Sequence, residues 1–186
     1  MTRTLMIVPM AAVLVLLGAC SGGGGSEGVS AVPEGYPYPV QTPERVEDRT
    51  HLQIGEAFDG YTSDPPPSGP HTGVPANWGI APEVLAKEVP VHNMEHEGVV
   101  VWYNCDAGLP LTPDQCTELQ NDLGAIVQPA ATSGTRVVMT AYPSMESRIA
   151  LTAWGFLDAF DEFDADRVQL FIDTFECNYD PEGFCG

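Results

Sequence analysis

The chain has 186 residues and a formal net charge of −19, with 26 acidic side chains against seven basic ones. This length is enough for a single domain with a buried core. The acidic surface excludes nucleic acid, because binding to phosphates needs basic patches, and it argues against docking on anionic lipid.

The first 20 residues have the pattern of a secretory signal. Arg3 is followed by an apolar run over residues 5–17 and by "LGAC", which ends at Cys20. The run is too short to span a bilayer. Because "LGAC" resembles a bacterial lipobox, we expect residues 1–19 to be removed and Cys20 to carry a lipid. The alternative is an ordinary cleaved signal with a coincidental cysteine. The lipid would anchor the protein to the cell membrane on its extracytoplasmic side.

Composition divides the rest of the chain into a tether and a domain. Residues 20–50 are rich in Gly, Ser, Pro and Glu, which predicts a flexible tether. Residues 51–186 are expected to form one globular domain. Within it, prolines and glycines of residues 61–82 exclude a helix or a central strand. A loop this long in a compact domain is usually functional.

Regular elements are predicted after this loop. "GVVVWYN" (98–104) is β-branched and aromatic, as buried strands are. Thr112, Pro113 and Gln115 then form the start of a helix with a capping box. Two more strands are predicted at 135–142 and 147–154. A last helix begins after Asp164, with apolar residues at helical spacing. The fold expected is α/β: a mixed sheet with helices packed on it, in the order strand, helix, strand, strand, helix.

Four cysteines remain once Cys20 is assigned to lipid. An even number outside the cytoplasm predicts two disulfides, for which three pairings exist. Pairs Cys105–Cys116 and Cys177–Cys185 are favoured because each closes a short loop.

The acidic run "DAFDEFDAD" (158–166) does not fit a calcium-binding EF-hand, because the loop glycine and the terminal glutamate are missing. We interpret it as a solvated turn that leads into the last helix.

"HNMEHEG" (92–98) matches the H-x-x-E-H motif of inverted zinc peptidases. Those enzymes need a sustained helix, whereas Pro90 and the strand after Gly98 leave one or two turns here. A short turn still brings His92 and His96 to one face, where they can share a metal ion. The alternative is a pair of ordinary histidines that hydrogen-bond to nearby backbone.

Two further residues extend this predicted metal site. His71 ends the stiff "DPPPSGPH" segment, whose prolines would fix its position. Met139 is a predicted soft ligand, because a thioether among imidazoles selects copper, especially cuprous ion, over zinc. Core packing is the alternative role for Met139, and Met94 and Met145 are alternative thioethers. Glu95 is expected to accept an imidazole N–H and so to fix its tautomer.

The motifs "PPPSGPH", "VHNMEHEGVVVWY", "VVMTAYPSM", "IALTAWG" and "PEGFC" together resemble a bacterial family of domains of unknown function, the one numbered 3105, over about residues 54–186. The resemblance implies no established activity. The positions that it implies are important are His71, His92, Glu95, His96, Met139, Tyr142, Pro143 and Trp154. Tyr142, and Tyr103 on the first strand, are expected next to the metal ligands.

The chain departs from the family pattern at two places. Glu97 stands where the family typically has a glycine after the second histidine. Asn77 and Trp78 stand where the resemblance implies a cysteine that bonds the C-terminal one in many members, and its absence supports Cys177–Cys185 here.

The function predicted from the sequence is binding, delivery or sequestration of a transition metal, copper first and zinc as the alternative. A metal-free module of the cell envelope, whose Pro-rich loop contacts a partner protein, is the second hypothesis. A zinc-dependent hydrolase is the third.

Overall fold

The computed structural model describes residues 31–178 and 185 and is built on a five-stranded sheet. Its strands are β3 (Gly79–Ile80), β4 (Val99–Tyr103), β5 (Val137–Ala141), β6 (Ile149–Ala153) and β7 (Phe156–Phe160), in the order β3-β5-β4-β6-β7. Strands β3, β5 and β4 run parallel to one another. Strand β6 is antiparallel to both of its neighbours, β4 and β7. The predicted mixed α/β sheet is therefore confirmed.

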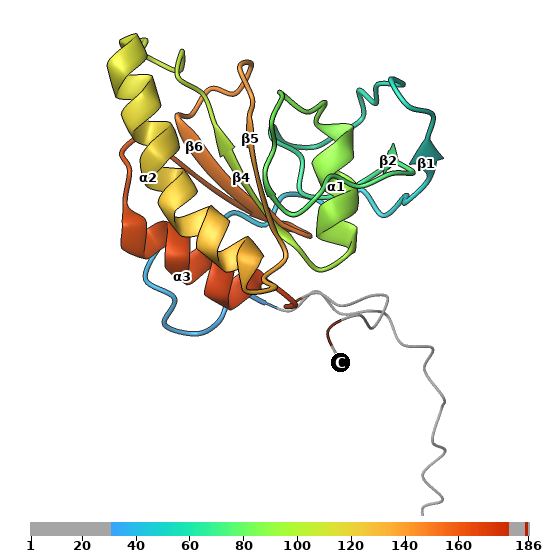
Figure 1. The fold of residues 1–186 in the computed structure, drawn as a ribbon. Helices are drawn as coiled ribbons and strands as arrows, with labels where there is room; N and C mark the ends of the chain where they lie inside the picture. Colours follow the sequence, from blue (N-terminus) through green and yellow to red (C-terminus); the bar gives the residue numbers. More distant parts are fainter. Residues whose placement is uncertain (1–30, 179–184, 186) are drawn as a thin grey trace, which may run out of the picture.

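Helices cover both faces of the sheet (Figure 1). Helices α2 (Pro113–Thr132) and α3 (Ala165–Phe175) pack on one face. Helix α1 (Glu88–Glu95) lies on the other face, next to a small parallel sheet made of β1 (His51–Leu52) and β2 (His71–Thr72).

The apolar run of strand β4 is continuous because both faces of the strand are buried. Val99 and Val101 belong to the core on the α2 and α3 side, whereas Val100 and Trp102 belong to the core on the α1 side. Side chains of a strand alternate between faces, so a strand covered on both faces needs apolar residues at every position.

Both predicted helix starts are confirmed. The Thr112 side chain accepts from the backbone N–H of Gln115, whose own side chain accepts from the N–H of Thr112, which is a complete capping box. Asp164 caps α3 by accepting from the backbone N–H of Arg167.

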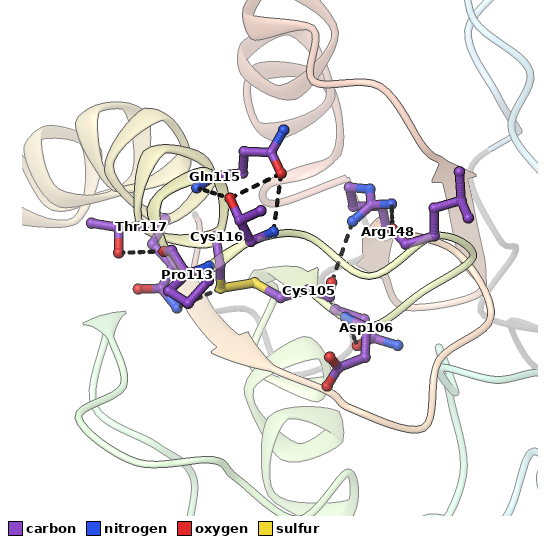
Figure 2. The surroundings of a disulfide bond; sticks show 11 residues. Cys105, Asp106, Pro113, Gln115, Cys116, Thr117 and Arg148 are labelled. Atoms are coloured by element: carbon purple, nitrogen blue, oxygen red, sulfur yellow. Dashed lines mark hydrogen bonds between the residues drawn. A yellow bond between two sulfur atoms is a disulfide. The ribbon is translucent and has the colours of Figure 1, made fainter.

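The predicted disulfide pairs are both present, Cys105–Cys116 and Cys177–Cys185. Figure 2 shows the first, which joins the loop after β4 to the first turn of α2. Arg148 supports the same loop by donating to the carbonyl oxygens of Ala107 and Leu109.

The acidic run was misread in part. Phe156–Phe160 is strand β7, which pairs with β6 after a turn at Gly155, whose φ is 82°. Asp158 on this strand is fully buried and forms a two-point contact with Arg167, so it is not solvated.

Part of the predicted tether contacts the domain. Tyr36 and Val40 pack against the main core, and Gln41 pairs with Leu157 of β7. Apolar residues scattered through this Gly- and Pro-rich stretch hold it to the domain from residue 31 on. The predicted signal, residues 1–19, and Cys20 lie outside the described residues. Within the described part of the chain, no helix has the length and apolar character needed to cross a membrane.

Candidate metal centre

Three histidines and one glutamate converge between β1, β2 and α1. His51, His71, His92 and Glu95 each offer one ligand atom, and these atoms all lie within 4.8 Å of one another. His51 and His71 are register partners in the parallel pair β1–β2, so their side chains lie next to each other. His92 and Glu95 are three residues apart on α1, which places them on one helix face.

Helix α1 is as short as the sequence predicted, with eight residues. Pro90 is tolerated because it falls in the first turn, where no intrahelical N–H bond is lost. The helix ends in a Schellman motif: Glu97 donates to the carbonyl of Met94, and Gly98 donates to that of Asn93.

Glu97 occupies the left-handed position of this motif, with φ of 62°, where glycine is normally favoured. This is the position at which the chain departs from the family pattern. Its carboxylate is buried and pairs with Arg136 over 3.2 Å. The ion pair is thus one contact that holds a non-glycine residue in the strained conformation.

His71 is held with its ligand atom pointing at Glu95. The ring is fully buried, and Nδ1 lies 2.9 Å from the carbonyl oxygen of Gly69, so Nδ1 carries the proton. Its Nε2 lies 2.9 Å from Glu95 Oε2 but has no partner in hydrogen-bond geometry. An imidazole nitrogen and a carboxylate oxygen at this distance can be two ligands that share a cation.

His92 has the same protonation pattern. Its Nδ1 donates to the carbonyl oxygen of Thr72 over 2.6 Å, so Nε2 is the acceptor atom of the ring, and it lies 3.1 Å from Nε2 of His96. Burial lowers the pKa of His92, and the neighbouring His71 and His96 lower it further. The imidazole is therefore neutral at physiological pH, as a metal ligand must be.

Glu95 supplies the negative charge of the group. Burial acts to raise its pKa, but the contacts with His71, His92 and Arg49 outweigh burial, and the pKa lies below its usual value. Arg49 Nε lies 3.7 Å from Glu95 Oε1. Glu95 is thus an ionised carboxylate among imidazoles, a stronger role than the tautomer-fixing one predicted from the sequence.

His51 forms the solvent side of the group. Its side chain is 55% exposed, and its Nε2 lies 3.9 Å from Glu95 Oε2. The ring stacks on that of His92 with centroids 5.0 Å apart. The other members of the group are buried, so this side is where an ion can enter or leave.

The structure brings together only part of the site predicted from the sequence. His71 and His92 belong to the group. His96 lies outside it but touches it, because its Nε2 is 3.1 Å from Nε2 of His92. His51 was missed, since it precedes the motifs and stands at the predicted domain boundary. Its only signal was its residue type.

The structure does not place Met139 next to the histidines, so its predicted role as a soft ligand is corrected. It is buried in the core on the α2 and α3 side of the sheet, with Leu119 and Leu123, whereas the histidines lie on the α1 side. Strand alternation gives the reason: Val138, its neighbour, is the residue that faces α1. The alternatives Met94 and Met145 are buried in the apolar core on the α1 side.

The two predicted tyrosines have other contacts. Tyr103 packs at the edge of the α2-side core. The Tyr142 hydroxyl donates to Asp64, and burial together with this carboxylate raises the pKa of Tyr142 to about 12. Trp154, in contrast, lies edge-on to His71 with centroids 6.3 Å apart, so it borders the four-residue group.

The donor set is three imidazole nitrogens and one carboxylate oxygen. Ligand atoms that share an ion lie about 3–4 Å apart, since each bond to a metal such as zinc is about 2.0–2.2 Å long. The group is close to this spacing without any ion. Cysteines 105, 116, 177 and 185 are in disulfides, so none of them offers a thiolate. The chemistry available is that of a divalent ion with nitrogen and oxygen ligands.

No curated protein and no solved structure gives a significant match to the chain. The family described as "Protein of unknown function (DUF3105)" matches residues 51–184, which include all four members of the group. This match covers well over half of the sequence, so the chain belongs to that family.

Proposed function

We propose that this domain binds a divalent transition-metal ion through His51, His71, His92 and Glu95, for exchange with other proteins or for sequestration. The observation that carries the proposal is the buried Nε2 of His71, which faces a carboxylate oxygen at 2.9 Å without a hydrogen-bond partner. A buried polar atom left in this state is unfavourable unless a cation or a proton lies between the two groups.

Two features favour an ion over a proton. His71 and His92 both direct Nδ1 to backbone carbonyls, which is the outer arrangement typical of metal-bound histidines. The low pKa of His92 keeps its ring neutral. Because the half-exposed His51 leaves one side open, the site suits an ion that is taken up and released.

The metal is proposed to be Zn²⁺ or Cu²⁺. Imidazole and carboxylate ligands suit both ions, and the affinity of such sites is generally higher for Cu²⁺. Copper thus remains within the proposal in its cupric form. The preference for cuprous ion depended on Met139, which faces the opposite core.

The proposed location is extracytoplasmic, with an anchor through lipid on Cys20. Two disulfides support an oxidising compartment, because cytoplasmic thiols are kept reduced. The lipobox-like sequence before Cys20 supports the anchor. Mass spectrometry of the purified N-terminal peptide tests it: a diacylglycerol-modified Cys20 is expected, and an unmodified cysteine would contradict the anchor.

The metal site is tested by titrating purified tagless protein with Zn²⁺, Cu²⁺ and Cu⁺ under calorimetric detection. The variant His51→Ala is informative because its exposed side chain is not needed for the core. We expect it to weaken binding of Zn²⁺ by about tenfold or more. His71→Ala should abolish binding, because it removes the most buried ligand.

His96→Ala is the matched control, since His96 is the remaining histidine and lies outside the four-residue group. A smaller loss for His96→Ala than for His51→Ala supports the group described by the structure. A larger loss of affinity for His96→Ala than for His51→Ala would instead favour the three histidine ligands predicted from the sequence, His71, His92 and His96. If wild type and His71→Ala bind every ion equally weakly, the proposal is wrong.

A further inference from the structure

A groove lies beside the candidate metal centre, with a volume of about 730 Å³. Sites for small molecules commonly have volumes of about 300–1,000 Å³. Four segments line the groove: residues 54–57 after β1, residues 72 and 74–77 at the end of β2 and after it, residues 80–82 at the edge of the main sheet, and residues 85–86 and 88–89 at the start of α1.

The rim of this groove is apolar and exposed. Ile54 is 84% exposed, Val74 is 59% exposed and Ile80 is 45% exposed, and all three line the cavity. Single exposed apolar side chains are ordinary, but several around one cavity mark a binding surface.

One wall of the groove is fixed firmly to α1. Asn93, which is fully buried, accepts from the backbone N–H of Ala76 over 2.8 Å and donates to the carbonyl oxygen of Ala76 over 2.9 Å. On the opposite side, the N–H of Leu85 donates to the Thr140 hydroxyl over 3.1 Å. These bonds fix the positions of both walls in the absence of a ligand, as in a preformed site.

The charge of the lining selects the kind of ligand. Among the described residues that line the groove, the charged side chains are Glu56 and Glu88, both acidic. Glu88 is only 4% exposed, and its carboxylate accepts from the N–H of Phe58 over 3.1 Å. The net charge of the chain, −19, adds a field of the same sign.

We propose that this groove binds a small apolar molecule that carries a positive charge, of the alkylammonium class. The apolar chain lies along the rim residues Ile54, Val74 and Ile80, and the ammonium group lies near the glutamates. This site is separate from the four metal ligands and does not need an ion to be present.

The test is calorimetric titration of the purified protein with decylammonium and with decanoate, both below their micelle concentrations. We expect decylammonium to bind at least about tenfold more tightly than decanoate. Glu88→Gln retains an acceptor for Phe58 and removes the charge. It should therefore reduce the preference for the cation while far-ultraviolet circular dichroism stays unchanged.

A matched pair of variants separates the groove from general attraction to an acidic surface. Val74→Arg places a cation at the rim, whereas Val84→Arg makes the same change at a valine of equal exposure, 59%, that does not line the groove. Val74→Arg should weaken decylammonium binding by about tenfold and Val84→Arg by less than about twofold. Equal effects of the two variants, or equal affinity for decanoate and decylammonium, would overturn the proposal.

Discussion

The imidazole of His92 joins helix α1 to strand β2, because its Nδ1 donates to the carbonyl oxygen of Thr72 over 2.6 Å. The acceptor belongs to the backbone, so no side-chain substitution at Thr72 removes it directly. The ring is therefore oriented before any ion arrives. Ligands that are oriented in advance lose less conformational entropy on binding, which favours affinity.

Metal should stabilise the fold measurably. His51, His71 and His92 come from three separate segments, and the unfolded chain does not hold them together. At a free ion concentration about 100 times the dissociation constant, the free energy of unfolding should rise by about 2.7 kcal/mol. Thermal unfolding with Zn²⁺ and with a chelator measures this rise. It should vanish in His71→Ala, and a wild-type midpoint that ignores Zn²⁺ would count against the site.

Met139→Leu should leave metal affinity unchanged. Met139 packs in the core on the far side of the sheet from the histidines, and leucine has a similar volume. We expect a loss of less than about 1.5 kcal/mol in the free energy of unfolding. Titration with Cu⁺ in parallel with Zn²⁺ is the measurement. A selective loss of Cu⁺ binding in this variant would show that Met139 does act as a soft ligand.

Asn93→Ala should destabilise the domain by about 1–3 kcal/mol, because both backbone polar groups of Ala76 lose their buried partner. Urea unfolding measures the change. Asn77→Ala, an exposed asparagine on the same wall of the groove, is the control and should have little effect. Similar losses for the two variants would contradict the role of Asn93 as the clamp of this wall.

Asp158→Asn should be more damaging, at about 3–5 kcal/mol, because it leaves the Arg167 guanidinium without its buried counterion. The side chain of Asp158 is fully buried, and one of its two contacts with Arg167 is 2.8 Å long. Asp173→Asn on the exposed face of α3 is the matched control. Denaturant unfolding that gave equal midpoints for the two variants would contradict this assignment.

Local patterns predicted the elements whose causes are local. The Thr112 capping box and the Asp164 cap depend on side chains three residues from the backbone groups that they satisfy, so they are readable in the sequence. The apolar run of β4 was equally clear, because both its faces are covered.

The errors arose where distant segments meet. His51 became a candidate ligand only through pairing with β2, twenty residues later, in strands of two residues each. Asp158 looked solvated because its partner Arg167 stands in the next element. Met139 was assigned correctly to an alternating strand, but the face that it occupies depends on which helix covers that side.

The groove and the candidate metal centre share their covalent framework. One wall begins three residues after His51, a second begins directly after His71, and Glu88 and Val89 precede His92 on the same helix. An ion that binds these histidines therefore acts on the same segments that form the walls. Any coupling that results is reciprocal: the factor by which the ion tightens the groove ligand equals the factor by which that ligand tightens the ion. A molecule in the groove could thereby set how readily the metal is released.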